Sequence, residues 1–375
     1  MEFTIERSEL SRGLQITQSA VARKTTMPIL ANLLLSAEKD GLKILASDLE
    51  ITAVSTVKAE VKKSGSTSVN ARIFSEIVRE LPDGQVNFKL TEGERLELVS
   101  KGSRFKMVGI SADEFPNVPG LAVETKARFP AGMLTEMINR TIYSSSTDET
   151  RFNLNGICFE IASGDAKKEK NKESSLCMVA TDGHRLAMIT RPANGLDFSG
   201  RAIVPRRGLA EIRRVLESQQ EVGLSIHEGF FVIEANDFKV SMRLIDGEFP
   251  DYSQVIPKDT GAMASVKAAD LAQALRRVML MVSDREKCVR MTFAPENLRI
   301  SSSSPELGEA SEELPIRYQG DVLTVGFNAV YVHDVAAALG EEQNLIIELH
   351  GELGPGRFSV ENDESTIGIV MPMRL

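Results

Sequence analysis

The sequence predicts an α+β fold of three similar domains, each with antiparallel sheets and two helices. Two repeated patterns support this prediction. Three segments, beginning near Phe3, Phe129 and Val266, open with a short strand that is followed by apolar residues at helical spacing. A second helical pattern recurs inside each segment, with an acidic residue and a leucine at matching positions. This second pattern covers residues 71–81, 205–218 and 328–339. Repetition of this kind indicates an architecture in which the assembly, rather than one pocket, carries the function.

Two short segments predict where the domains end. In Glu114–Pro119 and in Glu248–Tyr252 a proline follows a phenylalanine, and proline favours an extended exit from the preceding element. We therefore expect domains at residues 1–124, 125–257 and 258–375. The middle domain is longer, and the excess falls in residues 164–175, which are rich in Lys and Glu. We interpret this insertion as a solvated hairpin tip that needs no function of its own.

Composition excludes several classes of protein. The chain has 375 residues, no Trp and a net charge of -9, which by itself argues mildly against a nucleic-acid partner. Its three cysteines, Cys158, Cys177 and Cys288, are scattered, which is typical of a reducing cytoplasm and not of a disulfide framework or a zinc site. The first residues do not form a signal peptide, and no apolar run approaches the ~20 residues of a membrane helix. We expect a cytoplasmic protein without a metal or cofactor.

The stretch Val179–Ile189 decides between an enzyme and a scaffold, because it contains both Asp182 and His184. The two residues stand close together on an expected turn, which gives poor geometry for a proton relay, so we do not interpret them as a catalytic dyad. The sequence contains no nucleophile elbow, phosphate-binding loop, metal-ligand spacing or carboxylate cluster. We interpret the stretch as a structural turn and half of a peptide-binding cleft, with no catalytic residues. A similar turn is expected around Asp48.

Three motifs carry a resemblance to a known family. They are Met27–Leu35 near the start, Thr181–Leu186 in the middle and Met371–Leu375 at the end. The whole chain resembles the bacterial DNA polymerase III beta subunit, the family of replicative sliding clamps. The resemblance implies a non-catalytic homodimer, joined head to tail into a six-domain ring around duplex DNA. It also implies that a clamp loader, DNA polymerase subunits and other proteins with a clamp-binding motif are its partners. A repeat scaffold that does not bind DNA is the alternative.

The distribution of charge agrees with a ring. Predicted helical segments cover residues 7–24, 71–81, 130–143, 205–218, 267–282 and 328–339. They contain 14 Lys and Arg against 8 Asp and Glu, a net charge of +6, so the rest of the chain carries -15. Six packed helices around a hole would span about 17 Å, and twelve would span about 34 Å. Only the larger hole admits duplex DNA, so a clamp of this kind needs two chains.

The resemblance also predicts residues that face DNA. A sliding protein should contact phosphates and not base edges, because a tight base contact would stop it. The predicted DNA-binding residues are Lys24, Arg72, Phe152, Asn153, Arg206 and Arg207. Relatives often have two aromatic residues where this chain has Phe152 and Asn153.

A peptide-binding cleft for partner proteins is expected beside the C-terminal tail. The resemblance places in it Arg151, Leu154, Thr181, Gly183, His184, Arg185, Leu186, Pro250, Val255, Asn328, Tyr331, Val370, Met371, Pro372, Met373, Arg374 and Leu375. Thr366–Val370 is expected to be the last strand, and the Met-Pro-Met that follows is expected to serve partners, since Pro cannot donate to a ladder. Met adapts to several ligands, and Leu and Phe side chains would anchor the peptide. Gln254 stands where relatives can carry a basic residue.

Two edge strands are expected to join the chains of the ring. One is a basic strand in the first domain, and the other is an acidic strand in the third domain beside the end of a helix. The predicted interface residues are Arg104, Phe105, Met107, Met281, Val282, Glu309, Glu312 and Glu313. Charge would set the register, while Phe105 and Met107 would pack on Met281 and Val282. Ordinary edge strands protected by charge are the other interpretation.

Overall fold

The computed structural model divides the chain into two compact units. It describes residues 1–22, 25–118, 120–125, 127–162, 174–193, 196, 200–283, 287–340 and 343–375. The first unit consists mainly of residues 1–132 and 207–244, and the second of residues 133–193, 200–206 and 245–375. Lys24 and the predicted hairpin tip as far as residue 173 lie outside the described residues.

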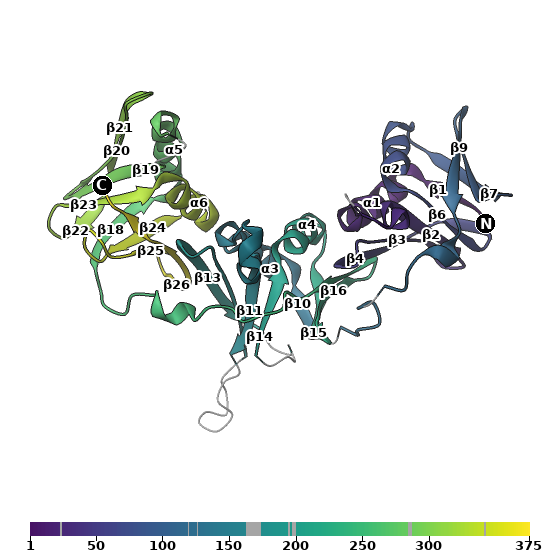
Figure 1. Cartoon of the computed structure of the whole chain (residues 1–375), viewed down its shortest axis with the longest axis horizontal. Helices are drawn as coiled ribbons and strands as arrows, with labels where there is room; N and C mark the ends of the chain where they lie inside the picture. Colours follow the sequence, from purple (N-terminus) through teal and green to yellow (C-terminus); the bar gives the residue numbers. More distant parts are fainter. Residues whose placement is uncertain are drawn as a thin grey trace, which may run out of the picture. The chain divides into compact units, whose positions relative to one another are not determined.

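The first unit contains a sheet of 13 described strands (Figure 1). In sheet order they are β10 (Ala127–Pro130), β15 (Glu221–His227), β16 (Phe230–Ala235), β17 (Phe238–Arg243), β4 (Ile51–Val57), β3 (Gly41–Ser47), β2 (Asn32–Glu38), β6 (Gly65–Asn70), β9 (Ser103–Ile110), β8 (Arg95–Ser100), β7 (Gln85–Thr91), β1 (Glu2–Glu6) and β5 (Glu60–Lys63). All the pairings are antiparallel, including that of β17 with β4, which pairs Val240 with Ala53 across adjacent repeats. The ladder therefore continues from one repeat into the next.

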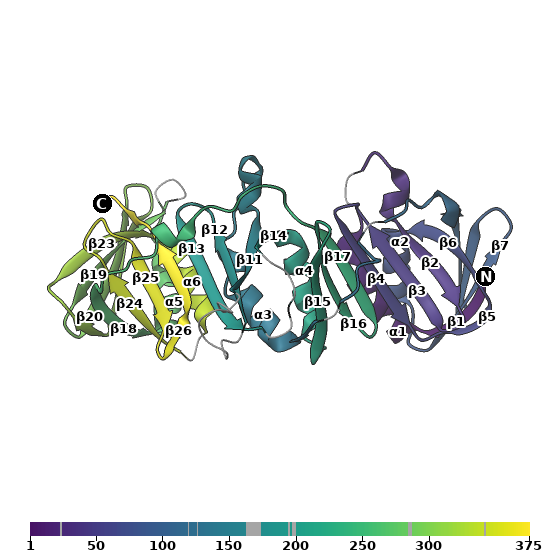
Figure 2. The ribbon, with the colours of Figure 1, turned by 90° about the horizontal axis from the view of Figure 1, so that it is seen from below.

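The second unit has two described sheets. The nine-stranded sheet runs β14 (Arg201–Pro205), β11 (Gly156–Ala162), β12 (Ser175–Thr181), β13 (Arg185–Pro192), β26 (Asp363–Val370), β25 (Gly356–Val360), β24 (Asn344–Leu349), β18 (Ala262–Lys267) and β22 (Arg317–Gln319). The five-stranded sheet runs β21 (Gly308–Pro315), β20 (Asn297–Ser304), β19 (Cys288–Ala294), β23 (Leu323–Asn328) and β27 (Pro372–Met373). In Figure 2, β13 lies beside β26, so this ladder also joins two repeats.

Six described helices are shorter than the sequence predicts. They are α1 (Arg7–Thr17), α2 (Ala71–Glu80), α3 (Ala131–Asn139), α4 (Arg206–Leu216), α5 (Ala268–Val278) and α6 (Ala329–Leu339). A 3-10 turn follows α1 at Gln18–Ala20 and another follows α5 at Met279–Met281. Within these bounds the helices carry 10 Arg against 7 acids, so their net charge is +3 and the predicted +6 is too large. None of the described helices is long and apolar enough to cross a membrane.

The second helix of each repeat begins in a similar way. Asn70 caps α2 by accepting a hydrogen bond from the Ile73 amide at 3.1 Å, and Asn328 caps α6 by accepting one from the Val330 amide at 3.0 Å. In the middle repeat Pro205 stands at this position, immediately before α4. Helices α1 and α2 lie side by side against the first sheet, and α5 and α6 lie together in the second unit (Figure 1).

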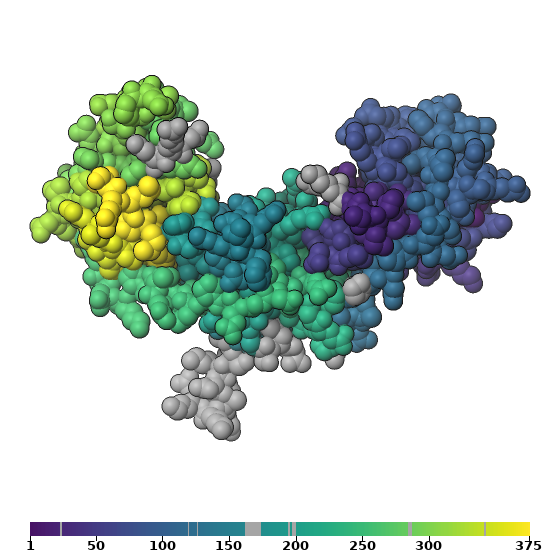
Figure 3. All heavy atoms as spheres, in the orientation of Figure 1, coloured from purple at the N-terminus to yellow at the C-terminus, as the bar shows by residue number. Residues whose placement is uncertain are grey.

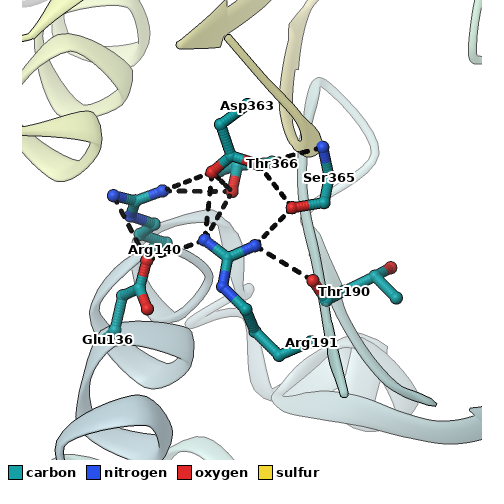
Figure 4. A network of polar contacts seen from close by, with 7 residues as sticks. All are labelled: Glu136, Arg140, Thr190, Arg191, Asp363, Ser365 and Thr366. Atoms are coloured by element: carbon teal, nitrogen blue, oxygen red, sulfur yellow. Dashed lines mark hydrogen bonds and ion pairs between the residues drawn. The ribbon is translucent and has the colours of Figure 1, made fainter. Parts of the chain in front are cut away.

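A charged network joins the middle and last repeats within the second unit (Figure 4). Arg191 lies 2.8 Å from Glu136 and 3.0 Å from Asp363, and Arg140 lies 3.1 Å from Asp363. The Asp363 carboxylate also accepts hydrogen bonds from Ser365 and Thr366. Burial acts to raise the pKa of Asp363, but these hydroxyls and Arg191 together hold it well below its usual value. The ionised carboxylate therefore stabilises the contact between α3 and β26.

We expect Asp363→Asn to lower the free energy of unfolding by about 2 to 3 kcal/mol at pH 7, because two arginines would lose a partly buried partner. The depressed pKa means that this stabilisation is present above the unfolded value of about 3.9 and is lost as pH falls. The difference between the variant and the unaltered protein should therefore shrink below about pH 4.

Urea unfolding at several pH values measures this difference. Asp83→Asn is the matched control, because its ion pair with Arg7 leaves the Asp83 side chain 90% exposed. Such exposed pairs contribute little, so the control should change stability by less than about 1 kcal/mol. Equal effects of the two substitutions would contradict a stabilising role for the network.

Candidate functional site

The turn between β12 and β13 is held by its own side chains. One carboxylate oxygen of Asp182 accepts hydrogen bonds from the amides of His184, at 2.9 Å, and Arg185, at 3.0 Å. Thr181 donates its hydroxyl to the Arg185 carbonyl at 2.7 Å, and Gly183 adopts φ +89°. The Asp182 carboxylate therefore contacts the His184 backbone, an arrangement that shapes the turn.

The predicted echo of this turn around Asp48 is confirmed. The Asp48 carboxylate accepts hydrogen bonds from the amides of Glu50 and Ile51 at 3.1 and 2.7 Å. The Glu50 carbonyl then accepts from the Arg243 amide at 2.8 Å, as the His184 carbonyl accepts from the Met371 amide at 2.9 Å. The turns at Asp48 and Asp182 thus make equivalent junctions in two repeats, with different side chains.

Arg185 connects the turn to α6. Its guanidinium lies 3.0 Å from Asp182 and 2.6 Å from Asp334, and the side chain is only 11% exposed. The same group lies 4.4 Å from the ring centre of Tyr331 and 5.6 Å from that of Tyr143, which favours cation–π contacts. Burial raises the pKa of both tyrosines. Arg185 therefore positions Tyr331 and the turn, and its charge is already neutralised.

The C-terminal tail differs from the prediction. Pro372 and Met373 form a short strand, β27, which pairs with Phe327 and Gly326 of β23. The expectation that the ladder stops at Val370 is wrong, because β27 lies at the edge of its sheet, where proline is tolerated. The tail leaves the nine-stranded sheet after Val370 and joins the five-stranded sheet. It lies at the surface of the second unit, in yellow in Figure 3.

Several residues predicted for the cleft meet around the turn and the tail. Leu154, Leu186 and Phe249 are buried in one apolar cluster, against which Tyr252 packs. Arg151 donates to the Asp182 carbonyl at 3.1 Å, so it also reaches the turn. Val255 and Met371 are 43% and 40% exposed, and Pro250 is exposed as well. The arrangement offers apolar side chains above a buried apolar floor, which suits apolar anchors of a peptide.

Tyr252 fixes the segment that carries Pro250 and Val255. Its hydroxyl donates to Glu160 at 2.9 Å, and Arg201 contacts the same carboxylate at 2.9 Å. The Tyr252 ring lies 5.3 Å from the Arg201 guanidinium. Gln254 donates to Asp251 at 2.9 Å.

A groove of about 1360 Å³ lies between α1, the start of α2 and α4 in the first unit. Arg72 lines it, as predicted for a residue that faces DNA, together with Arg12, Arg213 and Arg214, which the sequence analysis did not select. Helical spacing from Arg206 and Arg207 could have indicated the last two. Acidic residues also line the groove, so only part of its positive charge is available.

The predicted DNA-binding residues differ in what they contact. Arg207 lies 2.6 Å from Asp48 and donates to the Ser19 carbonyl at 3.2 Å, so its charge is largely engaged. Arg206 is exposed, and Phe152 is 58% exposed. Asn153 donates to the Glu248 carbonyl at 3.0 Å, an interaction that anchors the loop.

The two predicted interface strands differ in whether their edges are paired with another strand. β21 is an edge strand, as expected, whereas β9 lies between β8 and β6 in sheet order. However, β6 pairs only with Gly109 and Ile110, so the β6 side of residues 103–107 has no described partner strand.

Side-chain directions correct part of the predicted interface. Met107 is only 8% exposed, so it belongs mainly to its own core, while Val108 is 75% exposed. Phe105 and Met281 are each 37% exposed, and Leu280, which the sequence analysis missed, is 76% exposed. Glu312 accepts two bonds from Arg277, at 2.7 and 3.0 Å, so it is not a free acid. The exposure of the turn residues and the pairing of Glu312 depend on tertiary contacts.

Groups for covalent or metal chemistry are not assembled in the described part of the chain. There, no cluster of three or more His, Cys, Asp and Glu side chains has a geometry that could hold a metal ion. Burial raises the pKa of the Cys158 thiol to about 12, and it also raises the pKa of Cys177. Such thiols are poor nucleophiles at neutral pH.

Comparison with known proteins defines the class. Three models of the DNA polymerase III beta subunit match in order: the N-terminal domain at residues 1–119, the central domain at 128–251 and the C-terminal domain at 253–374. The beta sliding clamps of Vibrio cholerae and Escherichia coli K12 are 34% and 33% identical over 378 and 377 residues, with all of each chain covered.

Solved structures of sliding clamps have the same fold as this chain. The sliding clamp of Bacillus subtilis has a TM-score of 0.91 at 28% identity, covering 100% of this chain and 99% of that one. A clamp of Bartonella birtlesii bound to griselimycin has a TM-score of 0.91 at 29% identity, with both chains fully covered. Fold and repeats thus define a sliding clamp, a processivity factor and not an enzyme. The chain belongs to the DNA polymerase III beta subunit family.

Proposed function

We propose that two copies of this chain join head to tail into a closed ring that encircles duplex DNA and tethers a DNA polymerase to it. One observation carries this proposal. The first unit contains a partly unpaired strand with basic and apolar side chains, β9, and the second contains an acidic edge strand, β21, beside exposed apolar residues. Two unlike edges of this kind favour a heterologous contact, which generates a ring when the rotation between copies closes.

The interface we propose has an apolar centre and a charged rim. In this interface Phe105 of one copy would pack on Leu280 and Met281 of the other, and Val282 follows at the end of the 3-10 turn. Arg104 is exposed on β9, and Glu309 and Glu313 are exposed on β21. Lys106 lies 2.6 Å from Glu97, so it contributes less. Apolar anchors would supply affinity, and the charges would set register.

Inside the ring, arginines would contact phosphates without reading bases. Arg72 has a side chain that is 86% exposed and pairs with Glu76 at 3.0 Å, an exposed pair that phosphate can replace. Arg206 and Arg214 are exposed on α4, the helix with the largest excess of positive charge. Lys24 completes the proposed set, with Phe152 and Asn153 at the loop tip. Weak, screened contacts of this kind allow a protein to slide.

The turn, the tail and the Pro250–Val255 segment would form the site for a partner's peptide. We propose that it binds a short extended segment with Leu and Phe anchors, carried by polymerase subunits and other DNA-handling proteins. A clamp loader would use the same surface when it opens the ring in the cytoplasm. A repeat scaffold that does not bind DNA is not favoured by the family match.

Alanine substitutions test this peptide site. Leu154→Ala and Met373→Ala should each weaken binding of a labelled Gln-Leu-x-Leu-Phe peptide by about 1 to 2 kcal/mol, as for typical anchor residues. Fluorescence polarisation measures the affinity, and thermal unfolding shows whether Leu154→Ala, which also truncates a buried side chain, stays folded at the assay temperature. Leu353→Ala is the control, because Leu353 is 73% exposed on a loop of the same unit. Unchanged affinity in both site variants would contradict the proposal.

A further inference from the structure

A polar hollow of about 820 Å³ lies on the outer face of the five-stranded sheet. Alternation along β20 produces this face, because Leu298, Ile300 and Ser302 are buried while Arg299 and Ser303 are exposed. Across the sheet, Arg290 of β19 pairs with Ser301, and Ser301 pairs with Ser311 of β21. Guanidinium and hydroxyl groups from three adjacent strands therefore point to the same side.

The arginines of the hollow are available to a ligand. Arg290 is exposed, and its guanidinium makes no hydrogen bond or ion pair with the described residues. Arg299 donates to the Ser311 hydroxyl at 3.1 Å, which leaves its charge without a counter-ion in that part of the chain. Ser303 donates to Glu309 at 3.2 Å, at one end of the hollow. Two uncompensated guanidinium groups beside hydroxyls are suited to carboxylates, which arginine can bind through two parallel bonds.

The C-terminal tail forms one wall of the hollow and also belongs to the proposed peptide site. A Cβ at Gly326 would lie 2.6 Å from the Met373 carbonyl oxygen and 2.8 Å from Leu375 Cδ2, so the tail crosses β23 where only glycine leaves room. Leu375 therefore packs over Gly326, and Arg374 lines the hollow. At its other end the tail is bound to the turn through the Met371 amide. A peptide bound in the proposed site that extends along the tail would reach the hollow.

We propose that the polar hollow binds acidic residues that flank the clamp-binding segment of a partner protein. The inference rests on the peptide site proposed above, and it adds a second contact for the same partner. Single-stranded nucleic acid is a weaker candidate, because Glu309 lines the hollow and Glu313 lies opposite Arg299 on β21. Neighbouring acids repel a continuous phosphate chain more than they repel one or two carboxylates.

Peptides with different flanks test the proposal. The core Gln-Leu-x-Leu-Phe peptide is compared with versions that carry three Glu or three Lys residues on either side. We expect the Glu extension on one side to raise affinity by about three- to tenfold at low salt, an increase that high salt removes. Arg290→Ala combined with Arg299→Ala should abolish this increase and leave the affinity for the core peptide unchanged. Arg317→Ala, at an exposed arginine of β22, is the matched control and should keep the increase.

A charge reversal gives a sharper result. Arg290→Glu should reduce binding of the Glu-extended peptide and increase binding of the Lys-extended one. Suppose that the unaltered protein binds the core peptide normally but binds the Glu-extended and Lys-extended peptides with equal affinity. This result would contradict the proposal that the hollow binds acidic residues, and it would leave the proposed peptide site intact. Failure of the core peptide to bind would contradict both. A single-stranded oligonucleotide could also displace the Glu-extended peptide. If the double variant also loses binding of that oligonucleotide, the hollow would be assigned to nucleic acid instead.

Discussion

Leu280→Asp combined with Met281→Asp should convert the protein from a dimer into a monomer. Each change places a carboxylate in the proposed apolar centre, where an unpaired charge would have to be desolvated. The loss should exceed about 3 kcal/mol, which raises the dissociation constant by more than two orders of magnitude. Sedimentation velocity over a range of concentrations measures the mass directly.

The same substitutions should leave the fold and the peptide site intact, because Leu280 is 76% exposed in the single chain. Val322→Asp is the control, since Val322 is 66% exposed at another place in the second unit and should have no effect on the mass. Phe105→Ala on the opposite strand should also yield monomers. An unchanged dimer in both the double variant and Phe105→Ala would show that the chains meet elsewhere.

Deletion of Met371–Leu375 should remove peptide binding from a protein that is still a folded dimer. The deletion takes away the methionines proposed to contact the ligand, but only one short edge strand, β27, from the sheet. The β23 edge that it uncovers is short, so the sheets should persist. We expect the affinity for the core peptide to fall by about a hundredfold or more, since several anchors are lost together.

Fluorescence polarisation measures this loss, and sedimentation shows whether the dimer remains. A shorter deletion of Arg374–Leu375 is the matched control, because it retains Met371 and Met373 and should keep most of the affinity. Full binding of the core peptide by the longer deletion would place the peptide site elsewhere on the chain.

The repeats were predictable because their signals are local. Helical and strand periodicity, together with an acidic residue and a leucine at matching positions, indicated where each repeat places its second helix. The family match now supports three clamp domains of this fold. Helix ends were less predictable, as at Thr17, where a 3-10 turn replaces the expected continuation. The apolar pattern there is the same in both conformations.

Ion pairs and strand register could not be predicted from the sequence. Arg207 contacts Asp48 across 159 residues, and nothing in the local pattern of either indicates the other. Likewise, the sequence did not show that Met107 is buried while Val108 is exposed, because the register of β9 on β8 selects which face meets the core. The place of Pro372 in β27 depended on the sheet edge to which the tail returns. Residues with the right chemistry were thus identified, while their availability depended on tertiary contacts.

The most direct test of the ring is retention on circular DNA. The clamp is loaded onto a nicked circular plasmid, and the salt concentration is then raised until binding to a short linear duplex is lost. Screening weakens phosphate contacts but does not break a topological link, so the protein should stay on the circle and leave when a restriction enzyme linearises it. Loss from circular and linear DNA at the same salt concentration would contradict the ring.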